Sequence, residues 1–146
     1  MDLQSFLPYR LAVLTESVSR GIAQVYAQRF DLSREEWRVL AALGQAGRMK
    51  TQAALLTTTL DKMQVSRAVS RLERKGFVER EEDTEDRRNR ILRLTAAGRA
   101  AYRRIEPMVL ARETFLLEAL DEEERAALDR ALDKLVERAR QLERQG

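Results

Sequence analysis

The chain has 146 residues, of which 44% are hydrophobic, 35% charged and 5% aromatic, and it contains neither cysteine nor histidine. This composition predicts one soluble, helix-rich domain and excludes disulfides, thiol chemistry and metal sites built from thiolate or imidazole ligands. No apolar run reaches the ~18 residues of a membrane span, and the N-terminus lacks the layout of a signal peptide, so we expect a cytoplasmic protein.

Positive charge is concentrated in the middle of the chain. Residues 50–104 contain 14 Lys and Arg against 8 Asp and Glu, whereas the remaining segments have a net charge of −3. Charge of one sign gathered in one part of a chain is typical of a nucleic-acid-binding surface. The alternative is a basic face that is merely solvated.

The first two predicted elements are helices. Apolar side chains recur every three or four positions over residues 6–30, which predicts an amphipathic helix. A second helix begins after Ser33, because Ser33 and Glu36 have the spacing of a capping box, and it should end near residues 44–47.

A short helix and a longer central helix follow. The short one covers residues 50–59, with Thr51 as one possible N-cap. The central helix begins after a second capping box, formed by Asp61 and Gln64, and Gly76 supplies the left-handed residue that ends it. One face of the central helix is apolar, and its other faces carry serine, glutamine and arginine.

A β-hairpin comes next. It consists of a short strand, 77–80, and its partner, 91–94. The polar, largely charged loop between them has about ten residues, which is long for a hairpin. We therefore expect the loop to project from the domain.

Two helices complete the chain. The first covers residues 96–120, is capped by Thr95 and contains Pro107, which should kink it or start a new segment. The second follows a third capping box, at Asp121 and Glu124, and its leucines recur with a spacing near 3.5. An apolar seam on the helix at each end of the chain predicts a homodimer formed through the termini. The alternative is a monomer in which the two helices pack together.

The run DKMQVSRAVSRLERKGFVER, followed by EDRR and LRLTAAGR, resembles the MarR family of bacterial transcriptional regulators. The resemblance extends from residue 10 to residue 142 and is densest over 61–98. It implies a mainly α fold with a small β-hairpin wing. The whole chain, 1–146, would be a single MarR-type domain, made of a winged helix-turn-helix part (about 33–98) and helical dimerisation parts (about 1–30 and 99–146).

The same resemblance implies a homodimer that binds a pseudo-palindromic DNA operator. The central helix would be the recognition helix. Its apolar face would pack on the rest of the domain, and its polar face would contact base edges in the major groove. Arginine can bind guanine and glutamine can bind adenine in bidentate fashion, and arginines at a wing tip can enter the minor groove. The predicted DNA-binding residues are Gln64, Ser66, Arg67, Ser70, Arg71, Arg87, Arg88 and Arg90.

Other charged residues beside these have separate expected roles. Arg74 and Lys75, at the far end of the central helix, should touch phosphate or solvent. An ion pair on the exposed helix, for example with Glu73 or Glu79, is the alternative role for Arg71 and Arg74. Asp86 should pair with an arginine and shape the wing loop. Neutralisation of several phosphates per subunit predicts steep salt dependence.

Many family members release DNA when a small, often aromatic, ligand binds, so the resemblance also implies an effector pocket. It would lie where the dimerisation helices meet the winged part. The candidate lining residues are Arg10, Leu14, Trp37 and Arg38, which offer an arginine for a carboxylate and an aromatic wall. Trp37 also has a structural explanation, because it occupies the hydrophobic-staple position of its helix opposite Leu32.

The chain departs from the family pattern in the helix before the recognition helix. Members usually have a Glu-Leu-Ala-like triplet there, whereas this chain has Ala53, Ala54 and Leu55, or a register one residue later. The pattern therefore leaves open where that helix starts, and whether Thr51 or Gln52 contacts phosphate.

Two other classes of function compete with a DNA-binding regulator. An enzyme is disfavoured, because the chain has no glycine-rich phosphate loop, no nucleophile elbow and no grouping of catalytic side chains, and no cofactor or metal is expected. The second class is a winged-helix protein used for protein–protein contact or for non-specific DNA or chromosome binding. Among regulators we favour a repressor, since a small dimer can simply occlude a promoter.

Overall fold

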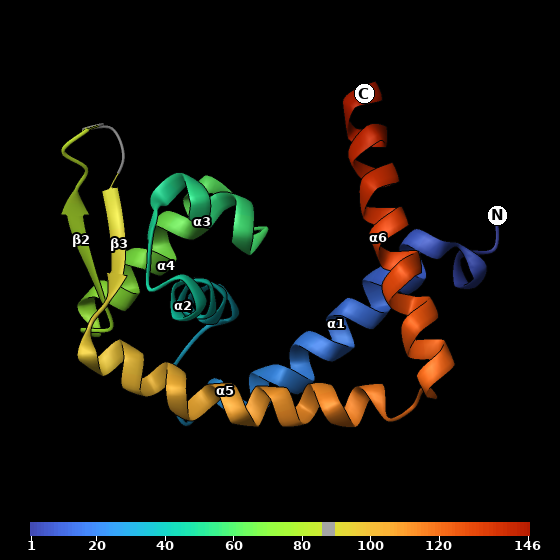
Figure 1. Cartoon of the computed structure of the whole chain (residues 1–146), viewed down its shortest axis with the longest axis horizontal. Coiled ribbons are helices and arrows are strands. Elements are labelled where there is room, and N and C mark those ends of the chain that lie inside the picture. The colour runs from blue at the N-terminus through green and yellow to red at the C-terminus, as the bar shows by residue number, and fades with distance from the viewer. Residues whose placement is uncertain (86–89) are drawn as a thin grey trace. The chain divides into compact units, whose positions relative to one another are not determined.

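The computed structural model describes residues 1–85 and 90–146, which form two compact units, Met1–Val109 and Leu110–Gly146 (Figure 1). The first unit contains the 3-10 turn η1 (Leu3–Ser5), helices α1 (Leu7–Tyr26), α2 (Arg34–Ala46), α3 (Thr51–Thr58) and α4 (Lys62–Arg74), and strands β1 (Arg48–Lys50), β2 (Val78–Glu82) and β3 (Arg90–Leu94). Helix α5 (Ala96–Leu117) begins in the first unit, and α6 (Glu122–Gln145) belongs to the second. No helix in the described ranges is long and apolar enough to cross a membrane.

All three predicted capping boxes form. In each capping box, the N-cap side chain accepts a hydrogen bond from the backbone N–H of residue N3, three positions later. The N3 side chain in turn accepts a hydrogen bond from the backbone N–H of the N-cap residue. The pairs are Ser33 and Glu36 for α2, Asp61 and Gln64 for α4, and Asp121 and Glu124 for α6. Local sequence therefore determines where these helices begin.

The C-terminal end of α4 is also defined locally. Gly76 has a φ of 79°, the left-handed conformation that glycine adopts without penalty. Phe77 donates its N–H to the Leu72 carbonyl at 2.9 Å, and Gly76 donates to the Glu73 carbonyl at 3.0 Å. These two bonds are those of a Schellman motif, and they confirm the predicted stop at Gly76.

The small sheet has three antiparallel strands in the order β1-β3-β2, and so contains one strand more than predicted. Strand β1 pairs with β3, with Met49 opposite Leu92, and β2 pairs with β3 on the other side, with Val78 opposite Leu94. β1 is only three residues long, Arg-Met-Lys, and too short to show a period-2 pattern. Its pairing depends on β3, more than 40 residues later in the chain.

Helix α3 starts at Thr51, and the prediction of Thr51 as its N-cap is wrong. The N-cap position is Lys50, which makes no side-chain cap bond. The Thr51 hydroxyl instead donates to the Arg90 carbonyl at 2.9 Å. Because β1 leads directly into α3, this hydroxyl ties the start of α3 to β3.

Two other helix boundaries differ from expectation. Helix α1 ends at Tyr26, four residues before the predicted end at residue 30. Helix α5 continues through Pro107, so the prediction that a new segment could start there is not met. A proline removes one backbone donor, but the helix extends on both sides of Pro107.

The apolar face predicted for the central helix is buried. Val65, Ala68, Val69 and Leu72 of α4 are each at most 2% exposed, and they belong to a core with side chains of α2, the sheet and α5. Figure 1 shows α2, α3 and α4 grouped together, with the β2–β3 hairpin beside α4. Burial of one face of α4 leaves its polar residues on the outside.

The end of α4, the start of the hairpin and the start of α5 meet at one point. The Thr95 hydroxyl caps α5 by accepting from the Gly98 N–H at 3.0 Å, and it donates to the Gly76 carbonyl at 2.5 Å. Gly98 is buried, and an added Cβ there would lie 2.0 Å from the Phe77 carbonyl oxygen. The hairpin backbone therefore passes against α5 at a distance that only glycine allows.

Candidate nucleic-acid interface

The outer face of α4 carries the residues predicted to read base edges. Ser66, Arg67 and Arg71 are exposed, whereas Gln64 and Ser70 are partly buried. The five residues share one helix that is capped at both ends. They are therefore held in fixed relative positions on one helix, which a surface that contacts base edges requires.

Two of these five side chains also have bonds within the protein. The Gln64 side-chain oxygen accepts from the Asp61 N–H at 3.0 Å, which leaves its amide nitrogen as the available donor. The Ser70 hydroxyl accepts from the Arg80 guanidinium at 2.9 Å, and Arg80 also pairs with Glu73 at 3.5 Å. Arg80, which sequence reasoning missed, thus links β2 to Ser70 on the outer face of α4.

The arginines of α4 differ from their expected alternative role. Glu73 pairs with Arg80 and not with Arg71 or Arg74. Within residues 1–85 and 90–146, no carboxylate lies within ion-pair distance of Arg67, Arg71 or Arg74. Three cations on one helix are therefore available to an external anion.

The wing is described only in part. Asp86, Arg87 and Arg88 lie outside the described residues, so their predicted roles stay predictions. Arg90 is exposed and pairs with Glu82 at 3.0 Å. Two further acidic residues of the hairpin are paired with cations of β1 and β3: Asp83 with Lys50 and Glu81 with Arg93. This pairing reduces the repulsion that acidic side chains would exert on DNA phosphates.

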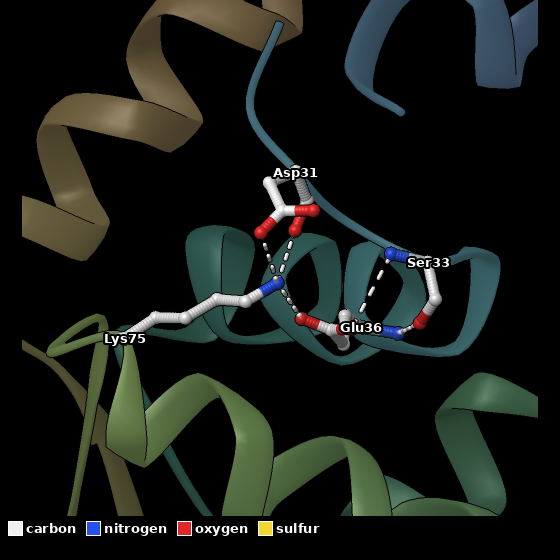
Figure 2. A network of polar contacts seen from close by, with 4 residues as sticks. All are labelled: Asp31, Ser33, Glu36 and Lys75. Carbon is white, nitrogen blue, oxygen red and sulfur yellow. Dashed lines mark hydrogen bonds and ion pairs between the residues drawn. The ribbon is translucent and has the colours of Figure 1, made fainter. Parts of the chain in front are cut away.

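Lys75, which was predicted to touch phosphate or solvent, pairs with two carboxylates of the protein itself. Its ammonium lies 2.6 Å from a carboxylate oxygen of Glu36 and 3.9 Å from one of Asp31 (Figure 2). The Lys75 side chain is 26% exposed, and its ammonium is directed toward Glu36 at the start of α2.

The four candidate effector-binding residues fall in two places. Trp37 stacks between Tyr26 and Tyr102, with ring centroids 5.5 and 6.4 Å apart, and Arg38 donates to the Thr59 hydroxyl at 3.2 Å. Burial lowers the pKa of Arg38 below its usual range. Arg10 and Leu14 are exposed on α1, about 24 and 18 Å along the helix axis from Tyr26 at 1.5 Å per residue. A single chain therefore does not bring Arg10 and Leu14 to Trp37.

A cleft of about 730 Å³ that sequence reasoning missed lies between the end of α2 and the first half of α5. The Tyr102 hydroxyl in it donates to Glu106, and this hydrogen bond, together with burial, raises the pKa of Tyr102 to about 12. Two exposed arginines four residues apart on α5 are the signal that could have indicated it. The lining residues include Gly44, Gln45, Leu94, Arg99, Tyr102 and Arg103.

Apolar side chains remain exposed on the terminal helices. The first half of α1 exposes more than 40% of each of its large apolar side chains, and the leucine seam of α6 is 38–68% exposed. Contiguous apolar stripes of this size are uncommon on the surface of monomeric soluble proteins. The residues are Leu7, Leu11, Val13 and Leu14 in α1, and Leu128, Leu132, Leu135, Val136 and Leu142 in α6.

Known proteins share this sequence pattern and this fold. The model of the MarR family matches residues 30–89. A relative from Bacillus cereus, named as an HTH-type transcriptional regulator of uncharacterized role, is 27% identical over 118 residues, which are 80% of this chain and 78% of the relative.

Two solved structures superpose over nearly the whole chain. A MarR/EmrR family transcriptional regulator from Acinetobacter sp. ADP1 has a TM-score of 0.87 and 28% identity, and the match covers 97% of this chain and 99% of that one. FabT from Streptococcus pneumoniae, solved in complex with DNA, has a TM-score of 0.74 and 25% identity with the same coverage. The match of residues 30–89 and the winged helix-turn-helix architecture shared over nearly the whole chain support a MarR-family winged-helix transcriptional regulator.

Proposed function

We propose that the chain binds double-stranded DNA selectively as a homodimer and represses transcription from a pseudo-palindromic operator. The observation that carries the proposal is the outer face of α4, where Arg67, Arg71 and Arg74 have no carboxylate partner among the described residues. FabT from Streptococcus pneumoniae, which is 25% identical to this chain and was solved in complex with DNA, supports DNA binding by this fold.

The chemistry of this face suits the major groove. Arg67 and Arg71 present bidentate donors that match the two acceptors of guanine. The available amide nitrogen of Gln64 and the hydroxyl of Ser66 add donors near the start of α4. Arg74, in the last turn, is placed for a phosphate contact, which orients the helix without reading sequence.

Arg67→Ala tests this proposal. Loss of one bidentate contact should weaken operator binding by ~1–3 kcal/mol and relax the preference at one base pair of each half-site. The measurement is a competition titration of an operator, selected from a random library with the parent protein, against random DNA at equal salt.

Arg130→Ala is the matched control, because it removes the same charge from an exposed position on α6. It should leave the base preference unchanged. An unchanged base preference in Arg67→Ala would show that Arg67 does not contact a base. Equal affinity of the parent protein for operator and random DNA would instead support non-specific DNA binding.

The exposed apolar stripes of α1 and α6 support a dimer formed through the terminal helices. A two-fold dimer places two recognition helices about 34 Å apart, which matches half-sites one turn apart on one side of the duplex. The pseudo-palindromic operator follows from this symmetry. The neutralised phosphates of both half-sites would together give steep salt dependence.

Release by a small aromatic carboxylate is the regulatory part of the proposal. Two sites compete for such a ligand: the predicted site with Arg10 and Trp37, and the cleft with Arg99 and Arg103. In either, a guanidinium would bind the carboxylate and an aromatic side chain would contact the ring.

A thermal-shift screen of aromatic acids at fixed protein concentration tests the two sites. A ligand at about 100 times its Kd stabilises by ~2.7 kcal/mol, which for a domain of this size raises Tm by several degrees. We expect the parent shift to disappear in Arg10→Ala or in Arg103→Ala, according to which site binds. An equal shift in Arg10→Ala and the parent would dismiss Arg10, and no shift with any acid would dismiss this ligand class.

A further inference from the structure

Lys75 closes a polar network that joins three segments of the first unit. It is the C-cap residue of α4, and its ammonium binds a Glu36 carboxylate oxygen at 2.6 Å near the start of α2. The same ammonium donates to the Asp31 backbone carbonyl and lies 3.9 Å from the Asp31 carboxylate. Asp31 belongs to the linker between α1 and α2, and Figure 2 shows its oxygens directed toward the lysine.

The Glu36 carboxylate is buried, because its side chain is only 4% exposed. One carboxylate oxygen accepts from the Ser33 N–H at 3.4 Å, and the other binds Lys75. A buried carboxylate needs a nearby cation and hydrogen-bond donors to remain charged at low cost. Lys75 supplies that cation, while the capping box supplies the donor.

The linker is shaped for this contact. Asp31 has a φ of 53°, a left-handed conformation that aspartate tolerates better than most residues. This conformation accompanies a backbone carbonyl directed at the Lys75 ammonium. The end of α4 is thus attached both to the capping box of α2 and to the segment that follows α1.

We propose that Lys75 is a positioning residue for DNA recognition, which holds the C-terminal end of α4 at a fixed place against α2 and the α1–α2 linker. This inference rests on the proposed function of α4. The apolar contacts of α4 are not directional, whereas the contacts of Lys75 with Glu36 and Asp31 define where the helix ends. Arg67 lies eight residues before Lys75, about 12 Å along the axis at 1.5 Å per residue.

A small tilt has a large effect over that length. A rotation of about 10° displaces one end of a 12 Å segment by roughly 2 Å, which is enough to break a bidentate contact with a base. Lys75 would then affect base reading although its ammonium touches no base. A direct phosphate contact makes a different prediction, because the ammonium would release counterions on binding.

The experiment compares three single variants and one double variant with the parent protein. Lys75→Met keeps the aliphatic stem and removes the charge, and Glu36→Gln keeps an oxygen for the Ser33 N–H and removes the negative charge. Arg130→Met is the control, since it removes a cation from an exposed position on α6, outside the proposed DNA-binding face of α4. Operator and random-DNA affinities are measured over a salt series on protein shown to be folded by circular dichroism.

We expect Lys75→Met and Glu36→Gln each to lower the ratio of operator to random-DNA affinity about tenfold, with the salt slope of the parent retained. The double variant should lose no more than either single variant, because both break the same network. Arg130→Met should leave the ratio unchanged. A merely stabilising role for Lys75 would change Tm but not this ratio in folded protein.

Two results would overturn the inference. A salt slope reduced by about one in Lys75→Met would show a phosphate contact, and an unchanged ratio in folded Lys75→Met or Glu36→Gln would show that the network does not position α4. If Lys75→Met does not fold, Lys75→Arg and Glu36→Gln are compared instead. Lys75→Arg keeps the positive charge with a different geometry, so its ratio of operator to random-DNA affinity should lie between those of the parent and of Glu36→Gln. Failure of the proposed function is distinct, because the parent itself would then show no preference for its operator.

Discussion

Replacement of Gly98 by alanine is expected to lower the free energy of unfolding by about 3 kcal/mol, at the upper end of the range for overpacking. The added Cβ would lie 2.0 Å from the Phe77 carbonyl oxygen, which belongs to backbone and cannot rotate away. Relief requires the hairpin or the first turn of α5 to move, and such a movement strains the Thr95 cap. Urea denaturation followed by circular dichroism measures the loss.

Gly21→Ala provides the control for the loss of a glycine. Gly21 lies inside α1, and an added Cβ there would meet nothing within 4 Å. Alanine should therefore stabilise the helix by ~0.5–1 kcal/mol. Both variants must be compared at one protein concentration, since the stability of an oligomer depends on it. A Gly98→Ala protein as stable as Gly21→Ala would contradict the contact with Phe77.

The features that the sequence predicted correctly depend on short-range interactions. Each capping box joins residues three apart, and the Gly76 stop of α4 involves bonds across a span of six residues. The exposed positions of Arg67 and Arg71 follow from helical periodicity once the buried face of α4 is recognised. Such patterns can be read from neighbouring residues alone.

The features that the sequence did not predict depend on partners far along the chain. The Thr51 hydroxyl binds the carbonyl of Arg90, and Lys75 binds Glu36, each across 39 residues. Strand β1 and the contact of Gly98 with Phe77 likewise exist only after α4 and the hairpin have packed. No spacing rule predicts these contacts, because each depends on tertiary arrangement.

The site shows the same division. The residue types on α4 predicted an interface, but the bond of Ser70 with Arg80 and the ion pair of Lys75 with Glu36 depend on tertiary packing. The cleft beside Tyr102 combines residues of α2 with residues of β3 and α5. The α2 residues lie about 50 residues before the others in the sequence. Arg10 and Trp37 were grouped through a family resemblance, and in a single chain they lie on separate parts of the first unit.

Leu132→Glu is expected to dissociate the proposed dimer and to weaken operator binding by about 10²–10⁴-fold, because two linked half-site contacts become one. Leu132 lies in the leucine seam of α6 and is 43% exposed in the single chain. In a two-fold dimer one substitution places two unpaired carboxylates in the interface, each with a desolvation cost of several kcal/mol. Sedimentation equilibrium should change from about twice the 16.9 kDa chain mass to the chain mass itself.

Gln141→Glu is the matched control on the same helix. Gln141 follows Leu132 by nine residues, or two and a half turns, so it lies on the opposite face of α6. It adds the same charge outside the seam, and its like-charge pair with Glu137 costs only a few tenths of a kcal/mol. The mass and the operator affinity should stay as in the parent. A Leu132→Glu protein that remains dimeric would place the interface elsewhere, and a monomer that keeps full operator affinity would show that recognition does not need two copies of α4.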